Sequence, residues 1–205
     1  MTQRRRLTVL LVMNVAMIAA LIVVGLASRS LGVLAAGGDY VADSAAILLG
    51  IIAVTIRERV GPTSTAPTYV AAINAMALLV VTVFVLVAAA GRLLHGTPVI
   101  DGLPVLIVSA LTTGVMAAGV FVLGAGAGSE DLHMRSVLLD TASDALASAA
   151  VAISGAVIYL TGRYYWLDSA LSLAIGLVIG VGALRLLGSV TVALRQGTPL
   201  DIDDD

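Results

Sequence analysis

Four aspartates stand inside stretches of this chain that are otherwise apolar. They form two pairs with the same spacing, Asp39 with Asp43 and Asp140 with Asp144. Residues four positions apart lie on one face of a helix, so each pair would present two carboxyl groups on the same side. A charged carboxylate within a bilayer costs about 2.5–3.5 kcal/mol, so four would cost roughly 10–14 kcal/mol. The four carboxylates therefore require a partner that neutralises their negative charge.

The chain offers no basic partner for such a cluster. All eleven of its basic residues are arginines, and they fall at or beyond the ends of the apolar stretches, while His95 and His133 fall in the breaks between them. Protons or a bound cation remain as the neutralising species. Four carboxylates that converge from two helices would form a cage for a divalent cation. The alternative is that the aspartates are protonated and only hydrogen-bond between helices.

The composition indicates the elements that would carry these residues. Of 205 residues, 60% are hydrophobic and 12% are charged, whereas an average soluble domain is about 25% charged. This balance argues against a soluble enzyme, a nucleic-acid-binding protein and a disordered chain. Each apolar stretch is near or above the length that spans a bilayer as a helix. We therefore predict an all-α integral membrane protein with six transmembrane helices, at 7–27, 31–56, 69–90, 103–123, 135–160 and 167–188.

The arginines also predict the orientation of these helices. With the N-terminus inside, eight arginines lie on the cytoplasmic side, and only Arg29, Arg92 and Arg163 lie outside. The positive-inside rule then places both termini in the cytoplasm of a multi-pass protein of the cell membrane, with a bacterial inner membrane expected. Residues 1–199 would form the transport domain and residues 200–205 an acidic cytoplasmic tail. With a net charge of −2, no nucleic-acid partner is expected.

The chain resembles the cation diffusion facilitator family of proton-coupled exporters of divalent transition metals. The points of resemblance run along nearly its whole length: Asn14, the two Asp-x-x-x-Asp pairs, the Asn-x-x-x-Leu-Leu run that starts at Asn74, the stretch 158–168 and the tail 194–199. The family usually has Asp-Pro where this chain has Asp168-Ser169. It also usually continues into a cytoplasmic metal-sensing domain, for which this chain has no sequence.

The resemblance implies a function and a site. It implies a homodimer that exports a divalent metal by alternating access in exchange for protons, with Asp39, Asp43, Asp140 and Asp144 as the metal-binding residues. No catalytic residue, enzyme activity or prosthetic group is expected. Four oxygen ligands suit Mn²⁺, whereas the family more often carries Zn²⁺. Zn²⁺ and Mn²⁺ both remain candidates for the transported metal, and Fe²⁺, Co²⁺ and Cd²⁺ are ranked below them.

Two other classes of protein also use aspartates within a membrane. An intramembrane aspartyl protease needs Tyr-Asp and Gly-x-Gly-Asp, but Asp39-Tyr40 has the reverse order and Ala36 stands in place of the first glycine. A membrane assembly subunit would use protonated aspartates to hold helices together. Among the remaining residues, we predict that Asp168 caps the sixth helix and that Gly176-x-x-x-Gly180 forms a packing face or a dimer face.

Overall fold

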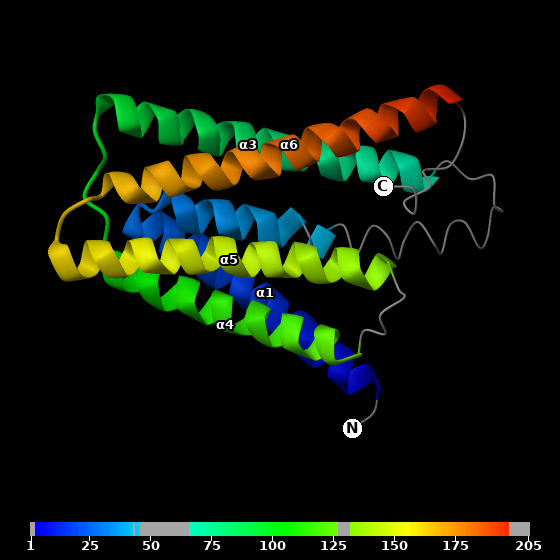
Figure 1. Ribbon diagram of the computed structural model, residues 1–205, viewed down its shortest axis with the longest axis horizontal. Helices are drawn as coiled ribbons and strands as arrows, with labels where there is room; N and C mark the ends of the chain where they lie inside the picture. Colours follow the sequence, from blue (N-terminus) through cyan, green and yellow to red (C-terminus); the bar gives the residue numbers. More distant parts are fainter. Residues whose placement is uncertain (1–2, 43, 46–65, 127–131, 197–205) are drawn as a thin grey trace.

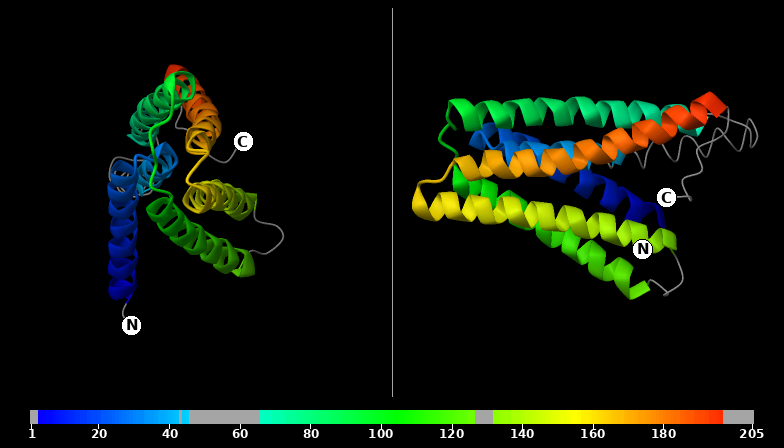
Figure 2. Two further views of the ribbon diagram at one scale, coloured as in Figure 1. Left: turned by 90° about the vertical axis from the view of Figure 1, so that its left-hand side faces the viewer. Right: turned by 45° about the horizontal axis from the view of Figure 1, so that its top comes forward.

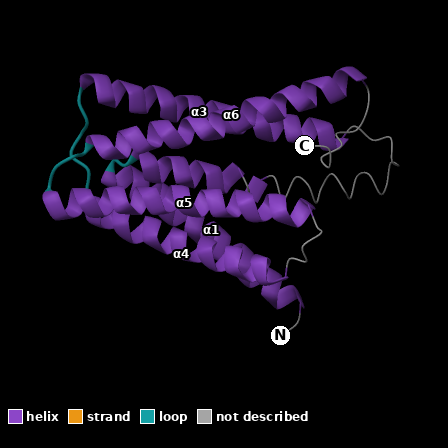
Figure 3. Cartoon of the chain, in the orientation of Figure 1, coloured by secondary structure: helices purple, strands orange, loops and turns teal. Residues whose placement is uncertain are grey.

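The computed structural model is a bundle of long helices (Figure 1). It describes residues 3–42, 44–45, 66–126 and 132–196, and within these ranges it contains helices and loops but no strand (Figure 3). A shorter helical segment begins at Leu31 and is described to Ala42 and again at 44–45. The long helices are α1 (Gln3–Ser28), α3 (Ala66–His95), α4 (Gly102–Gly126), α5 (Leu132–Thr161) and α6 (Trp166–Gln196). The predicted all-α class is confirmed for the described residues.

Four of these helices are long and apolar enough to cross a membrane. The crossing stretches are Ala71–His95, Gly102–Phe121, Thr141–Thr161 and Trp166–Arg195, and Val15–Ser28 and Leu31–Ala42 form shorter apolar helices. Large apolar side chains point outward from them, including Phe84 and Phe121, which are 69% and 79% exposed. Such an exposed apolar surface is what a lipid environment requires. The predicted count of six crossings and the predicted orientation stay predictions.

The helices are arranged in two groups with the segment Leu31–Ala42 between them. α3 packs along α6, and α4 packs along α5 with α1 at its side. Figures 1 and 2 show the segment running through the middle, between the α3–α6 pair and the α4–α5 pair. Its apolar face joins the core cluster, in which Val33 packs with residues of α1, α4 and α5: Leu21, Val105, Val108, Val151 and Ile158.

Glycine allows the backbones of α4 and α5 to come close together. A Cβ atom on Gly102 would lie 2.5 Å from the backbone nitrogen of Tyr159, and one on Gly155 would lie 2.7 Å from that of Leu106. Real Cβ atoms do not approach backbone so closely, so any larger residue would force the two helices apart. The tight α4–α5 pair therefore depends on small residues at the crossing, as in other membrane helix pairs.

The turn between α1 and the helical segment is a Schellman motif. The amide of Ser30 donates to the carbonyl of Gly25 at 3.0 Å, and the amide of Arg29 donates to that of Leu26 at 3.4 Å. Arg29 has the left-handed backbone that this motif requires, with φ of 59°. The side chain of Arg92 in α3 then donates to the Arg29 carbonyl at 2.6 Å. This turn reverses the chain and sets where the helical segment starts.

Candidate functional site

The helical segment that carries Asp39 has a complete cap at its N-terminus. A helix leaves its first four amides without partners inside the helix. The carboxylate of Asp168 accepts from the amides of Leu31 at 2.8 Å and Gly32 at 3.3 Å. The hydroxyl oxygen of Ser30 accepts from the amide of Val33 at 3.1 Å, and the amide of Ser30 itself donates to the Gly25 carbonyl at 3.0 Å. All four amides are therefore satisfied, which fixes the position of this end of the segment.

The prediction that Asp168 caps its own helix is wrong. Asp168 does lie in the first turn of α6, but its carboxylate accepts hydrogen bonds from the start of the neighbouring segment, including one from the Ser30 hydroxyl at 2.5 Å. The residue is 1% exposed. A buried carboxylate takes the strongest donors in reach, and the open amides at the start of the segment are such donors. Asp168 thus joins α6 to the segment that carries Asp39.

Three glycines set how the segment sits among its neighbours. A Cβ atom on Gly37 would lie 3.2 Å from Leu21 of α1, and one on Gly38 would lie 2.9 Å from Val81 of α3. A Cβ atom on Gly32 would lie 3.2 Å from Val151 of α5. Because glycine has no side chain, the segment lies closely against all three helices. Asp39 follows directly after Gly38, at the point where the segment meets α3.

The contact between Gly32 and Val151 relates the positions of two predicted site residues along the axis of the bundle. The segment starts at the end of the bundle where α5 finishes, so the two helices run in opposite directions (Figure 1). Asp39 comes seven residues after Gly32, and Asp144 comes seven residues before Val151. At 1.5 Å per residue, each aspartate lies about 10 Å from the contact, on the same side of it. Asp39 and Asp144 are therefore at about the same height along the axis of the bundle.

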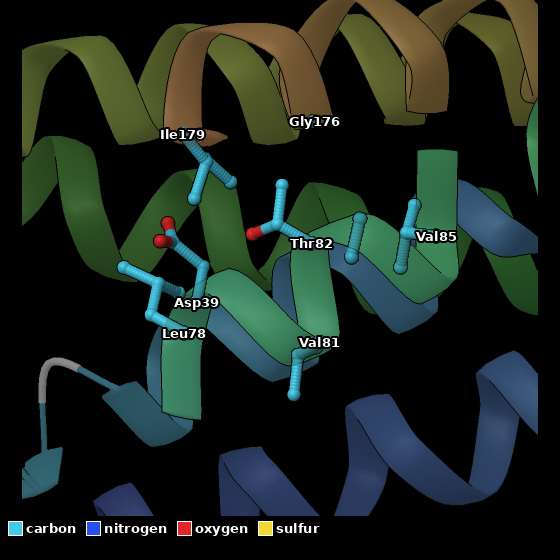
Figure 4. Close-up of a pocket in the computed structure, with 8 residues that line it drawn as sticks. Asp39, Leu78, Val81, Thr82, Val85, Gly176 and Ile179 are labelled. Atoms are coloured by element: carbon cyan, nitrogen blue, oxygen red, sulfur yellow. The ribbon is translucent and has the colours of Figure 1, made fainter. Parts of the chain in front are cut away.

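Asp39 faces a small cavity between the segment, α3 and α6. The cavity has a volume of about 10 Å³ and is lined by Ala35, Asp39, Leu78, Val81, Thr82, Val85, Gly176 and Ile179. Figure 4 shows the hydroxyl of Thr82 turned toward Asp39, whose carboxylate points toward Ile179. The other lining side chains are apolar. Asp39 is thus a partly buried carboxylate in mostly apolar surroundings, the setting in which a bound cation or a proton is needed.

The four predicted ligands are described to different extents. Asp39 and Asp144 are both partly buried and both have interactions with other groups. The backbone of Asp140 belongs to α5, whereas its side chain and the whole of Asp43 lie outside the described residues. Among the residues whose side chains are described, none from α5 lines the cavity beside Asp39. Within the described residues no three His, Asp or Glu side chains form a cluster that could hold a metal ion. The four-aspartate site stays a prediction.

The structure also adds residues that the sequence reasoning missed. Ser30 is a favoured N-cap residue just before a helix, so its type and position are a signal that could have found it. Thr82 lies in the run Val80–Leu86, where its type and spacing differ little from the β-branched neighbours, and we find no signal that singles it out. Of the two predicted roles of the glycine pair, a packing face or a dimer face, the structure supports packing within the chain: Gly176 lies against Leu86 of α3, and Gly180 lies against Thr82.

Comparisons with known proteins identify the family of this chain. Residues 7–194 match the family described as the cation efflux transmembrane domain. The zinc transporter ZitB of Escherichia coli (strain K12) is 31% identical over 192 residues, which are 89% of this chain and 59% of ZitB. The metal cation efflux system protein CzcD of Cupriavidus metallidurans is 28% identical over 207 residues, which are 97% of this chain and 64% of CzcD.

A third relative is named as an antiporter. The cadmium, cobalt and zinc/H(+)-K(+) antiporter of Bacillus velezensis is 24% identical over 186 residues, which are 87% of this chain and 59% of that protein. The chain thus spans about three fifths of the length of these relatives, whose names describe transport rather than catalysis. The match and the four apolar helices make this a multi-pass protein of the bacterial inner membrane. The chain belongs to the cation efflux family.

Proposed function

We propose that this protein exports a divalent transition-metal ion from the cytoplasm in exchange for protons. One observation carries the proposal: a partly buried carboxylate, Asp39, faces a mostly apolar cavity on the central helical segment of a cation efflux transmembrane domain. Asp144 stands at the same level on α5. A charged carboxylate inside a bilayer costs free energy, so aspartates retained there usually serve ion or proton transport.

The metal-binding site in this proposal consists of Asp39, Asp43, Asp140 and Asp144. Asp43 follows Asp39 by four residues, and Asp140 precedes Asp144 by four residues, so the two pairs extend in matching directions from a common level. Four carboxylates supply oxygen ligands and enough negative charge to bind a divalent cation away from water. The metal here is the substrate, so it must bind tightly enough to enter and weakly enough to leave.

Proton exchange follows from the electrostatics of such a group. Four neighbouring carboxylates in a medium of low dielectric constant cannot all be ionised without a cation. Their protons belong to the group as a whole rather than to single residues. When a divalent cation binds, it favours the ionised carboxylates and releases protons. Metal and protons therefore compete for one site, which is the requirement for exchange.

The arrangement of the helices offers a way for the site to face either side of the membrane. The segment Leu31–Ala42 lies between the α3–α6 pair and the group formed by α1, α4 and α5 (Figure 2). A shift of one group against the other would open one end of the space around Asp39 and close the other end, which is alternating access. We further propose that two copies of the chain assemble as a homodimer in the lipid bilayer.

The identity of the metal is a choice between two ions. The names of ZitB and of the Bacillus velezensis antiporter include zinc, which supports Zn²⁺ as the substrate. A site of four carboxylates without imidazole or thiolate supports Mn²⁺, because oxygen ligands suit that ion. Both ions are therefore used in the experiment below.

The proposal is tested by metal uptake into proteoliposomes whose lumen is acidic. Purified protein is reconstituted, and Zn²⁺ and Mn²⁺ are added outside in separate runs. We expect uptake that requires the pH gradient and that Asp39→Asn and Asp144→Asn each reduce by at least about 100-fold, since even residues behind a metal ligand contribute 10–100-fold. Asp101→Asn is the matched control, because Asp101 is an exposed aspartate in the loop before α4.

Two results would overturn the proposal. One is no uptake of either metal by wild-type protein that elutes as a single species and unfolds cooperatively. The other is uptake that Asp39→Asn and Asp144→Asn leave unchanged. An assembly subunit predicts the first result, with normal helix association. A protease would instead cleave a membrane-embedded peptide substrate added to the same vesicles.

A further inference from the structure

Thr82 is a buried residue of α3, and its hydroxyl makes no hydrogen bond to another residue among those shown for the described part of the chain. Thr82 is 4% exposed. Buried threonines in membrane helices usually donate to the carbonyl four residues earlier, as Thr112 and Thr113 do here, at 2.9 Å and 2.8 Å. Thr82 makes no such bond to Leu78 among the described hydrogen bonds. Polar side chains of buried residues normally have a hydrogen-bond partner, so the direction of this hydroxyl needs an explanation.

The Thr82 hydroxyl points into the cavity that Asp39 also faces (Figure 4). These two are the polar side chains of the lining, and they come from opposite walls, α3 and the segment Leu31–Ala42. The volume of about 10 Å³ is close to the roughly 10–15 Å³ that one water molecule needs. A water also needs at least two polar partners. A hydroxyl and a carboxylate on opposite walls provide them.

Packing on α6 explains why the Thr82 side chain takes this orientation. A Cβ atom on Gly180 would lie 3.3 Å from Cγ2 of Thr82, so the methyl group of Thr82 occupies the space next to that glycine. A β-branched side chain in a helix has few rotamers to choose from. With the methyl group against Gly180, the hydroxyl is held on the side of Asp39. The glycine therefore sets the direction of the threonine.

We propose that this cavity binds one water molecule that joins the Thr82 hydroxyl to the Asp39 carboxylate, and that Thr82 thereby positions Asp39 for the metal. The inference rests on the proposed transport function, because Asp39 is a metal ligand in that proposal. It adds a residue of α3 to a site otherwise built from the central segment and α5. It also connects the site to the α3–α6 pair.

Positioning residues of this kind have a measurable effect. Groups that hold a metal ligand from behind contribute about 10–100-fold to metal affinity when they are removed. Thr82 would act on affinity rather than on the rate of the conformational change, because it orients a ligand and touches neither the metal nor the ends of the helices. Its loss should therefore raise the metal concentration for half-maximal uptake and leave the maximal rate nearly unchanged.

The test compares Thr82→Val with Thr82→Ser in the uptake assay. Valine has almost the same shape as threonine but no hydroxyl, and serine keeps the hydroxyl. We expect the half-maximal metal concentration to rise by about tenfold or more with valine and to stay within about twofold of wild type with serine. The matched control is Thr112→Val, since Thr112 is fully buried in α4 and bonds only locally and to Met17.

A second measurement separates this inference from the transport function itself. Infrared spectra of metal-free protein contain a carboxyl band of Asp39, identified as the band that Asp39→Asn removes. The band should shift in Thr82→Val and stay in place in Thr82→Ser and Thr112→Val. A shift without any uptake by wild type would support the Thr82–Asp39 link and reject the transporter. Wild-type affinity together with an unshifted band in Thr82→Val would overturn the inference while transport stands.

Discussion

The carboxylate of Asp168 accepts a hydrogen bond from the Ser30 hydroxyl at 2.5 Å, although the two residues are 138 positions apart in the chain. Asp168 is 1% exposed and Ser30 is fully buried. The bond connects the start of α6 to the start of the segment that carries Asp39. A movement of α6 therefore acts directly on the segment that carries a proposed metal ligand.

This connection should contribute strongly to the stability of the folded protein. Asp168→Ala leaves the amides of Leu31 and Gly32 and the Ser30 hydroxyl without their acceptor, and each buried unpaired donor costs about 1–3 kcal/mol. Ser30→Ala removes a helix N-cap, which costs about 0.5–2 kcal/mol. We expect both variants to unfold at lower temperature in detergent, with Asp168→Ala the more severe.

The two substitutions should also be non-additive. Because they remove the two ends of one hydrogen bond, the double variant should lose less stability than the two single variants together, by about 0.5–3 kcal/mol. The measurement is the free energy of unfolding of all four proteins in one detergent. Ser189→Ala is the control, because Ser189 is exposed and donates only to the Arg185 carbonyl of its own helix. Strict additivity would mean that the Ser30–Asp168 bond contributes nothing.

The glycine contacts between α4 and α5 predict a clear contrast between two similar substitutions. Gly155→Ala places a methyl group 2.7 Å from the backbone nitrogen of Leu106, and overpacking of this kind costs about 1–3 kcal/mol. Gly114→Ala on α4 meets nothing within 4 Å and should leave stability unchanged or raise it, by about 0.5–1 kcal/mol at most.

Thermal unfolding of the two alanine variants in the same detergent checks this contrast. The midpoint should fall for Gly155→Ala and hold or rise for Gly114→Ala. Equal midpoints would show that α4 and α5 do not cross as closely as described.

The helices themselves could be predicted well from the sequence. Apolar stretches near or above the length of a membrane crossing placed the starts of the described helices to within four residues, because bilayer thickness determines segment length. The ends are less accurate: α6 continues to Gln196, eight residues beyond its predicted end. The predicted packing role of Gly176 and Gly180 is also confirmed, by their contacts with Leu86 and Thr82. These features depend on local composition and on spacing along one helix, which a single sequence contains.

The contacts between distant segments could not be predicted in the same way. Asp168 lies in the first turn of α6, so local sequence predicts a cap of that helix, whereas its hydrogen-bond partners are at positions 30 to 32. The link from Thr82 to the Asp39 cavity likewise depends on which face of α3 meets the segment. Contacts of this kind are determined by tertiary packing, so the spacing of residues within one helix does not predict them.

The turn after α1 predicts a stabilising substitution. Arg29 has a φ of 59°, and a residue other than glycine pays about 1–2 kcal/mol for this left-handed backbone. The Arg92 bond goes to the Arg29 carbonyl, which glycine keeps. Arg29→Gly should therefore raise the unfolding midpoint, whereas Arg29→Val should lower it. A lower midpoint for Arg29→Gly would show that the arginine side chain itself stabilises the turn.

The choice between zinc and manganese gives the last prediction. If four carboxylates form the site, one imidazole in place of a carboxylate should shift its preference toward zinc, because nitrogen ligands suit Zn²⁺ better than Mn²⁺. Asp140→His makes this change one ligand at a time, and Asp101→His places the same imidazole in an exposed loop. The ratio of the initial uptake rates of Zn²⁺ and Mn²⁺ should rise in Asp140→His and stay at the wild-type value in Asp101→His. An unchanged ratio in Asp140→His, with uptake retained, would remove Asp140 from the proposed site.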